Sequence, residues 1–211
     1  MIKERVEMAV LPLFKGFVIG AGMIIPIGAQ NAYILNQGIK RNYHLTAATI
    51  CILCDVILMS LGVFGGGALI NSNELLALII TWLGIAFLAI YGGMFFKSFY
   101  LAANESNKEK FSSSTRKTVV FTTLAVTLLN PHVYLDTVVI IGSISGQFSS
   151  EHKLWFLFGT LLASITWFYA LSLASAKMSP WLSRDKVQRG INLFVALIMW
   201  AIAASLFMQI K

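Results

Sequence analysis

Residues 75–96 read LLALIITWLGIAFLAIYGGMFF, a run without a charged side chain. A helix needs about 20 apolar residues to cross the ~30 Å hydrocarbon core of a membrane, so this run favours a transmembrane helix. Backbone amides that face lipid must bond within their own segment, which predicts helices throughout. The sequence therefore predicts an all-α integral membrane protein, a bundle of six hydrophobic helices. The other five segments are Leu13–Ala32, Leu45–Ile70, Val119–Ile141, Leu154–Ala176 and Ile191–Ile210.

The composition supports a membrane environment. Of the 211 residues, 57% are hydrophobic and 12% are charged, whereas a soluble domain has roughly 45–50% apolar and about 25% charged residues. The net charge of +7 comes from basic residues that lie between the apolar segments. This placement favours orientation in the membrane and contact with anionic membrane lipid, and it argues against nucleic acid as a partner.

A polar stretch at residues 102–117 divides the chain into halves of about 1–101 and 118–211, within a single transmembrane domain of residues 1–211. The first segment of each half carries a proline close to an asparagine, in PIGAQN (Pro26–Asn31) and in NPH (Asn130–His132). Paired interruptions in corresponding segments are typical of transporters built from repeats. Because each half has three segments, the sequence predicts two three-helix halves in inverted repeat.

The basic residues predict the orientation. Lys40 and Arg41 follow the first segment, five basic residues separate the third from the fourth, and four separate the fifth from the sixth. The two remaining loops carry none and one. The positive-inside rule places the three basic loops in the cytoplasm. The side of the N-terminus stays open, because the first segment is either a kinked complete span or a re-entrant segment.

Asp55 and Asp136 are the two acidic residues well inside apolar segments. An ionised carboxylate near the bilayer centre costs several kcal/mol unless it is paired or hydrated. Neither segment offers an intramembrane Lys or Arg as a partner. The two carboxylates are therefore candidates for binding a cationic substrate or a proton. The structural alternative is a carboxylate near an interface that caps a helix or pairs with a loop lysine.

The first interruption combines a helix breaker with two amides. Pro26 leaves a backbone carbonyl without its helical partner, and Gly28 allows a ligand or another chain to approach. Exposed backbone groups at membrane depth are tolerated where they line a cavity. Gln30 and Asn31 would add neutral polar contacts to a substrate. The alternative is a structural kink whose amides bond to neighbouring helices.

The second interruption lies in the fourth segment. Asn130 and Pro131 repeat the pairing of an amide with a helix breaker. His132 is a candidate proton carrier because imidazole titrates near neutral pH, although it could equally bond to a neighbouring helix. Tyr134 is a candidate hydrogen-bond partner for one of the carboxylates.

Cys51 and Cys54 form a CxxC pattern inside the second segment. This spacing is typical of dithiols in soluble oxidoreductases. A membrane thiol–disulfide oxidoreductase is thus the alternative function. Within an apolar helix, however, two buried small residues are the simpler interpretation.

The two interrupted stretches resemble the LysE-type amino-acid exporter family. The resemblance rests on PIGAQNAYILNQGIKR at 26–41 and LNPHVYLDTVV at 129–139, and it runs nearly end to end. It implies a membrane transporter, not an enzyme, that exports basic amino acids without a nucleotide-binding domain or cofactor. Ala29 departs from the family, which commonly has proline there. The polar residues of the family motifs map onto Gln30, Asn31, Asp55, Asn130 and Asp136.

These observations predict a multi-pass secondary exporter in the bacterial cytoplasmic (inner) membrane. The resemblance implies L-arginine as substrate, whereas physical chemistry alone leaves L-lysine open. Asp55 and Asp136 would alternate between the substrate cation and protons entering the cell. No metal is expected. The sequence leaves open whether copies of the chain form a homo-oligomer.

Overall fold

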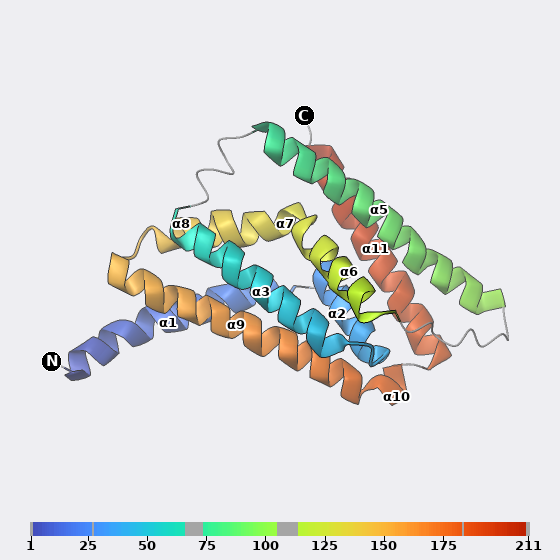
Figure 1. The fold of residues 1–211 in the computed structure, drawn as a ribbon, viewed down its shortest axis with the longest axis horizontal. Helices are drawn as coiled ribbons and strands as arrows, with labels where there is room; N and C mark the ends of the chain where they lie inside the picture. The colour runs from blue at the N-terminus through green and yellow to red at the C-terminus, as the bar shows by residue number, and fades with distance from the viewer. Residues whose placement is uncertain (1, 27, 66–73, 105–113, 183, 210–211) are drawn as a thin grey trace.

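The computed structural model describes residues 2–26, 28–65, 74–104, 114–182 and 184–209. Within these ranges the regular structure is helical, with no strand (Figure 1). The helices are α1 (Ile2–Ile24), α2 (Ala29–Ile39), α3 (His44–Val63), α5 (Glu74–Asn104), α6 (Arg116–Leu128), α7 (Pro131–Tyr134), the π-helix η1 (Leu135–Ile140), α8 (Ile141–Ser145), α9 (Ser150–Lys177), α10 (Ser179–Leu182) and α11 (Asp185–Gln209).

Among the described residues, four helices are long and apolar enough to cross a membrane, namely the whole of α3 and α9 and segments of α5 and α11. The bent pair of α1 and α2 adds a fifth span if the two are counted together. The prediction of an all-helical membrane protein is therefore confirmed. A sixth span and the inverted repeat stay predictions. The expected continuation of the second segment to Ile70 lies outside the described residues after Gly65.

The first predicted segment is not one straight helix. Helix α1 ends at Ile24, α2 begins at Ala29, and their axes differ by 79°. Pro26 lies in the break, and its ring blocks a regular helix while it lacks an amide hydrogen to donate. The predicted end of this segment at Ala32 was wrong, because α2 continues to Ile39 as a helix buried along most of its length.

Contacts with α9 favour a complete broken span over a re-entrant segment. Gly16 and Gly20 of α1 approach the backbone of Phe156 and Thr160, near the start of α9. Gly38 of α2 lies against Ser172 and Ser175, near its end. The α1–α2 pair thus follows about 29 Å of α9 at 1.5 Å per residue. The start of α1 and the end of α2 therefore lie at opposite ends of α9, with Lys40 at the same end as Lys177.

The fourth predicted segment is also interrupted. Helix α6 ends at Leu128, and the chain continues as α7, η1 and α8 from Pro131 to Ser145. These pieces run along α3. Cys51 of α3 contacts Thr127 of α6, and Gly62 lies against the backbone of Thr137 and Gly142.

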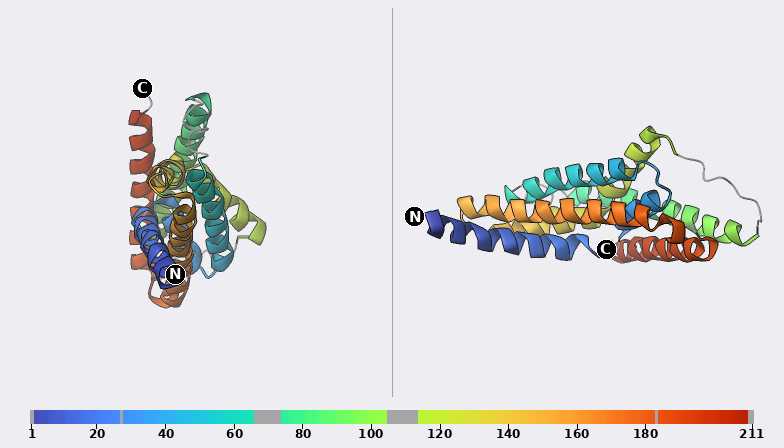
Figure 2. Two further views of the ribbon diagram at one scale, coloured as in Figure 1. Left: turned by 90° about the vertical axis from the view of Figure 1, so that its left-hand side faces the viewer. Right: turned by 90° about the horizontal axis from the view of Figure 1, so that it is seen from below.

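Helices α5 and α11 form a second antiparallel unit. Trp82 packs edge-on against Phe207, and further along the Trp200 indole donates to the carbonyl of Ala89 (3.2 Å). Figure 2 shows this unit toward the end of the molecule away from the start of α1. Its residues Leu88 and Val195 share one buried core with α2, α3 and α6.

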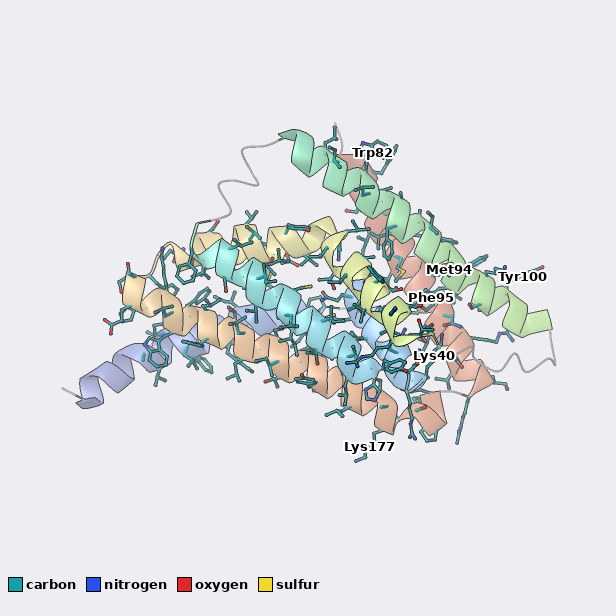
Figure 3. All side chains as sticks on the ribbon, viewed as in Figure 1. Lys40, Trp82, Met94, Phe95, Tyr100 and Lys177 are labelled. Carbon is teal, nitrogen blue, oxygen red and sulfur yellow. The ribbon has the colours of Figure 1, made fainter. Side chains whose placement is uncertain are left out.

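The distribution of side chains fits a lipid environment. Trp82, Met94 and Tyr100 project outward along α5 (Figure 3) and are 48%, 58% and 59% exposed. Polar side chains, by contrast, are buried between helices, among them Asp55 and Thr127. Apolar groups that face outward, together with polar groups that face inward, are expected where the surrounding solvent is hydrocarbon.

Candidate functional site

Asp55 lies in the middle of α3 and faces α9. Its side chain is 3% exposed. Its Oδ2 accepts a hydrogen bond from Ser164 Oγ of α9 at 2.6 Å. The described residues supply no basic side chain as a partner for this carboxylate. Asp55 is therefore buried between α3 and α9, and the partner of its carboxylate in α9 is neutral. Its role in binding a substrate or a proton stays a prediction.

The side chain of Asn31 bonds to backbone groups at the break between α1 and α2. Its Nδ2 donates to the carbonyl oxygens of Ile24 (2.7 Å) and Pro26 (2.9 Å), which the break leaves without helical donors. Its Oδ1 accepts from the indole nitrogen of Trp167 at 3.1 Å. Asn31 thus stabilises the broken backbone, while its predicted contact with a substrate stays a prediction.

Asp55 and Asn31 meet through the same stretch of α9. Their partners, Ser164 and Trp167, are three residues apart, which is about 4.5 Å along a helix. Two polar residues from different segments are therefore brought to one level of the bundle. That both side chains contact a substrate there stays a prediction.

Gln30 adds an amide at this level. Its Nε2 is buried and has no hydrogen-bond partner among the described residues, although the side chain lies beside Cys51. The sulfur of Cys51 is 3.8 Å from Thr127 Oγ1 of α6. An unsatisfied buried donor costs about 1–3 kcal/mol. The predicted contact of Gln30 with a substrate stays a prediction.

The second interruption lies between α6 and α7. Asn130 is 6% exposed and precedes Pro131, the first residue of α7. Tyr134 Oη donates to the carbonyl of Leu128 at 2.8 Å, which satisfies a backbone group at the end of α6. In this conformation the phenol proton points to that carbonyl, not to a carboxylate. The side chain of His132 lies outside the described part of the chain, so its proposed role as a proton carrier stays a prediction.

Asp136 lies in the π-helix η1 and is partly buried. π-Helical turns are rare and are often found at functional sites. The next residue, Thr137, touches Gly62 of α3, seven residues from Asp55 and thus about 10 Å further along that helix. The two carboxylates therefore lie on contacting elements at different depths.

Cys51 and Cys54 are both buried free thiols. Buried cysteines in apolar surroundings are unreactive compared with the exposed, activated thiols of oxidoreductases. The alternative function as a thiol–disulfide oxidoreductase gains no support.

Sequence reasoning missed the polar residues of α9. Thr160, Ser164, Ser172 and Ser175 are all buried. They lie four, eight and three residues apart, which places them along one face of a helix. This stripe is readable in the sequence. Trp167 was missed because its role depends on a contact 136 residues away.

The fold and this site define a multi-pass helical membrane protein that encloses a carboxylate between α3 and α9, beside a broken helix. The chain belongs to the LysE type translocator family, whose sequence pattern matches residues 21–210. No solved structure matches it.

Similar proteins include three that carry the name Arginine exporter protein ArgO. The protein from Pectobacterium carotovorum subsp. carotovorum is 46% identical, covering 91% of this chain and 94% of its own length. Those from Yersinia enterocolitica and Salmonella typhimurium are each 47% identical, covering 92% of this chain and 95% and 92% of their own lengths. The family assigns amino-acid transport to this chain.

Proposed function

We propose that this chain exports L-arginine, and L-lysine as a second basic substrate, from the cytoplasm in exchange for protons. The names of its relatives support the substrate. The observation that carries the proposal is the buried carboxylate of Asp55, whose bond from Ser164 is uncharged. Guanidinium suits such a carboxylate because its planar fork can donate two parallel hydrogen bonds.

Proton exchange follows from the cost of a buried charge. An ionised Asp55 inside the bundle needs a positive partner, and two are available to an exporter, the substrate cation and a proton. Binding of one excludes the other. A carboxylate that releases the cation outside and takes up a proton there would return without a net charge. Asp136 is the second carboxylate of this cycle, in the π-helix nearer the outer side.

Exchange for a proton also removes the electrical work of exporting a cation against the membrane potential. Moving one positive charge out of a cell that is negative inside costs about 2.3 kcal/mol per 100 mV. Entry of one proton for each exported cation cancels this electrical work. The pH gradient and the substrate gradient then drive export.

The remaining polar residues shape the substrate site or contact the substrate. Asn31 and Tyr134 keep the two breaks in shape through the backbone, and Gln30 offers a donor to the substrate carboxylate. We place the chain in the bacterial cytoplasmic membrane as one domain of six spans, with α6–α8 as the sixth and the halves in inverted repeat.

Transport by the purified chain in proteoliposomes tests the proposal. Vesicles loaded with labelled arginine should release it when an external acid pH is imposed, and lysine should follow more slowly. With a single cation exchanged for a single proton, an imposed voltage should leave the rate unchanged. Failure to release either amino acid would refute the substrate, and indifference to the pH gradient would refute proton exchange.

A further inference from the structure

Helix α2 carries two buried oxygen atoms that lack hydrogen-bond donors. The side chains of Asn36 and Gln37 are 8% and 7% exposed. Neither Asn36 Oδ1 nor Gln37 Oε1 has a hydrogen-bond partner among the described residues. Because buried polar atoms are nearly always paired in proteins, unpaired acceptors on two consecutive residues indicate that this turn of α2 receives donors from elsewhere.

In the orientation given by the positive-inside rule, these acceptors lie on the cytoplasmic side of Asp55. The neighbouring Gly38 rests against Ser175 of α9, whereas Asp55 is bonded to Ser164. Eleven residues of α9 separate the two levels, about 16 Å at 1.5 Å per residue. Asn36 and Gln37 are therefore close to the inner end of the bundle and well separated from the carboxylate.

Polar side chains connect the two levels along α2. Gln30 and Gln37 are seven residues apart, with Tyr33 between them on the same face. The Tyr33 hydroxyl lies near the carbonyl of Val119 (3.4 Å) and beside the side chains of Thr123 and Gln37. A polar line thus runs from the inner end of α2 to the level of Asp55.

We propose that Asn36 and Gln37 form an inner binding site for the cationic end of the substrate, occupied before it reaches Asp55. The inference rests on the proposed function as a basic amino-acid exporter. Two carbonyl oxygens can accept hydrogen bonds from a guanidinium, which carries five N–H donors, or from an ammonium, which carries three. Because these acceptors are neutral, they hold the cation less strongly than a carboxylate and allow it to move on to Asp55.

The charges around this site suit an amino acid that enters side chain first. Lys40 and Arg41 follow α2 within one turn of Gln37, and Figure 3 shows Lys40 at the same end of the bundle as Lys177. Arg41 is fixed there by the bond from its Nε to the carbonyl of Ala176 (3.1 Å). This positive charge complements the α-carboxylate that trails the guanidinium.

The experiment compares near-isosteric variants in vesicles of known orientation. Gln37→Met and Asn36→Leu remove the unpaired oxygens and keep similar side-chain volumes. A hydrogen bond to a charged group is worth enough to change affinity about 10- to 100-fold. Each variant should raise the KM for arginine presented at the cytoplasmic face by that factor, with lysine affected less, because it offers fewer donors. The KM for arginine presented at the outer face should not change.

Two further variants distinguish loss of the acceptor oxygens from a general disturbance of α2. Gln37→Glu keeps an acceptor and adds charge, so it should lower the cytoplasmic KM and slow turnover. Ile34→Val, a buried apolar change on the same helix, should leave both KM values unchanged. An unchanged cytoplasmic KM in Gln37→Met and Asn36→Leu would overturn the proposal, as would equal losses at both faces. If the wild-type chain moves neither amino acid, the proposed function itself fails.

Discussion

Replacing Asp55 by asparagine removes a negative charge while it keeps the shape of the side chain. The variant Asp55→Asn retains an oxygen that can accept the hydrogen bond from Ser164, which the carboxylate now accepts at 2.6 Å. The fold should therefore survive the change. We expect normal amounts of protein in the membrane and a loss of arginine export.

The size of the loss follows from the missing attraction. Two unit charges about 4 Å apart attract by roughly 4 kcal/mol at an effective dielectric constant of ~20. This corresponds to a decrease in affinity of about a thousandfold. The variant Ser164→Ala removes only one hydrogen bond to the charged group, worth about 1.5–3 kcal/mol, and should weaken binding roughly 10- to 100-fold.

Release of labelled arginine from proteoliposomes measures both effects, with thermal unfolding of the purified variants as the control for folding. Asp55→Glu keeps the charge and should restore part of the rate. Export by Asp55→Asn at the wild-type rate and KM would refute the reasoning. If the unfolding temperature of Asp55→Asn falls and the transport rate falls with it, Asp55 has a structural role instead.

Three other variants test the neighbouring parts. Asp136→Asn should abolish export without lowering the amount of protein in the membrane, and full activity would contradict a role for this carboxylate. Trp167→Phe removes the hydrogen bond to Asn31, which is worth about 0.5–1.5 kcal/mol. The unfolding temperature measured by scanning fluorimetry should therefore fall, and an unchanged temperature would disprove this contribution. Gly159→Ala places a methyl group against the backbone of α1 and should strongly destabilise the protein, whereas Gly22→Ala, with open space around it, should not. Equal unfolding temperatures of the two variants would contradict the close helix contact.

Local chemistry made several features predictable. Pro26 and Pro131 lack an amide hydrogen and cannot continue the helix that precedes them, and both lie at breaks that the sequence predicted. Pro12 lies inside α1 without ending it, so a proline alone does not determine a break. Asp55 was identifiable because a carboxylate in an apolar segment must find a polar site. These conclusions depend on single residues and their immediate neighbours.

Other features depend on contacts between distant segments. Asn31 could have faced a cavity, and its bond to Trp167 became evident only from packing against α9. Asn36 and Gln37 were missed because the apolar window ended at Ala32, whereas surrounding helices bury α2 to Ile39. The π-helix around Asp136 was not predicted, since periodicity alone does not reveal one extra residue in a turn.

The contacts of α9 differ in kind on its two sides. Against α1 the contact is tight and involves backbone, because Gly16, Gly20 and Gly159 carry no side chain. Against α3 it includes hydrogen bonds between side chains, which water or substrate can replace at a net cost of about 0.5–1.5 kcal/mol for a neutral pair and about 1.5–3 kcal/mol for the bond to the Asp55 carboxylate. These bonds are His44–Ser172, Thr49–Tyr169 and Asp55–Ser164.

We therefore expect the α3–α9 interface to open during transport, while α1 moves together with α9. In a chain with both native cysteines changed to serine, a short thiol cross-linker between Thr49→Cys and Tyr169→Cys should stop arginine export. The same cross-linker between Leu13→Cys and Phe156→Cys should not change the rate that this double variant shows before cross-linking, because it joins two helices that already move as one. Arrest by both links, or by the α1–α9 link alone, would show that the helices part elsewhere. Restored export after removal of the cross-linker from the α3–α9 variant would exclude damage by the substitutions themselves.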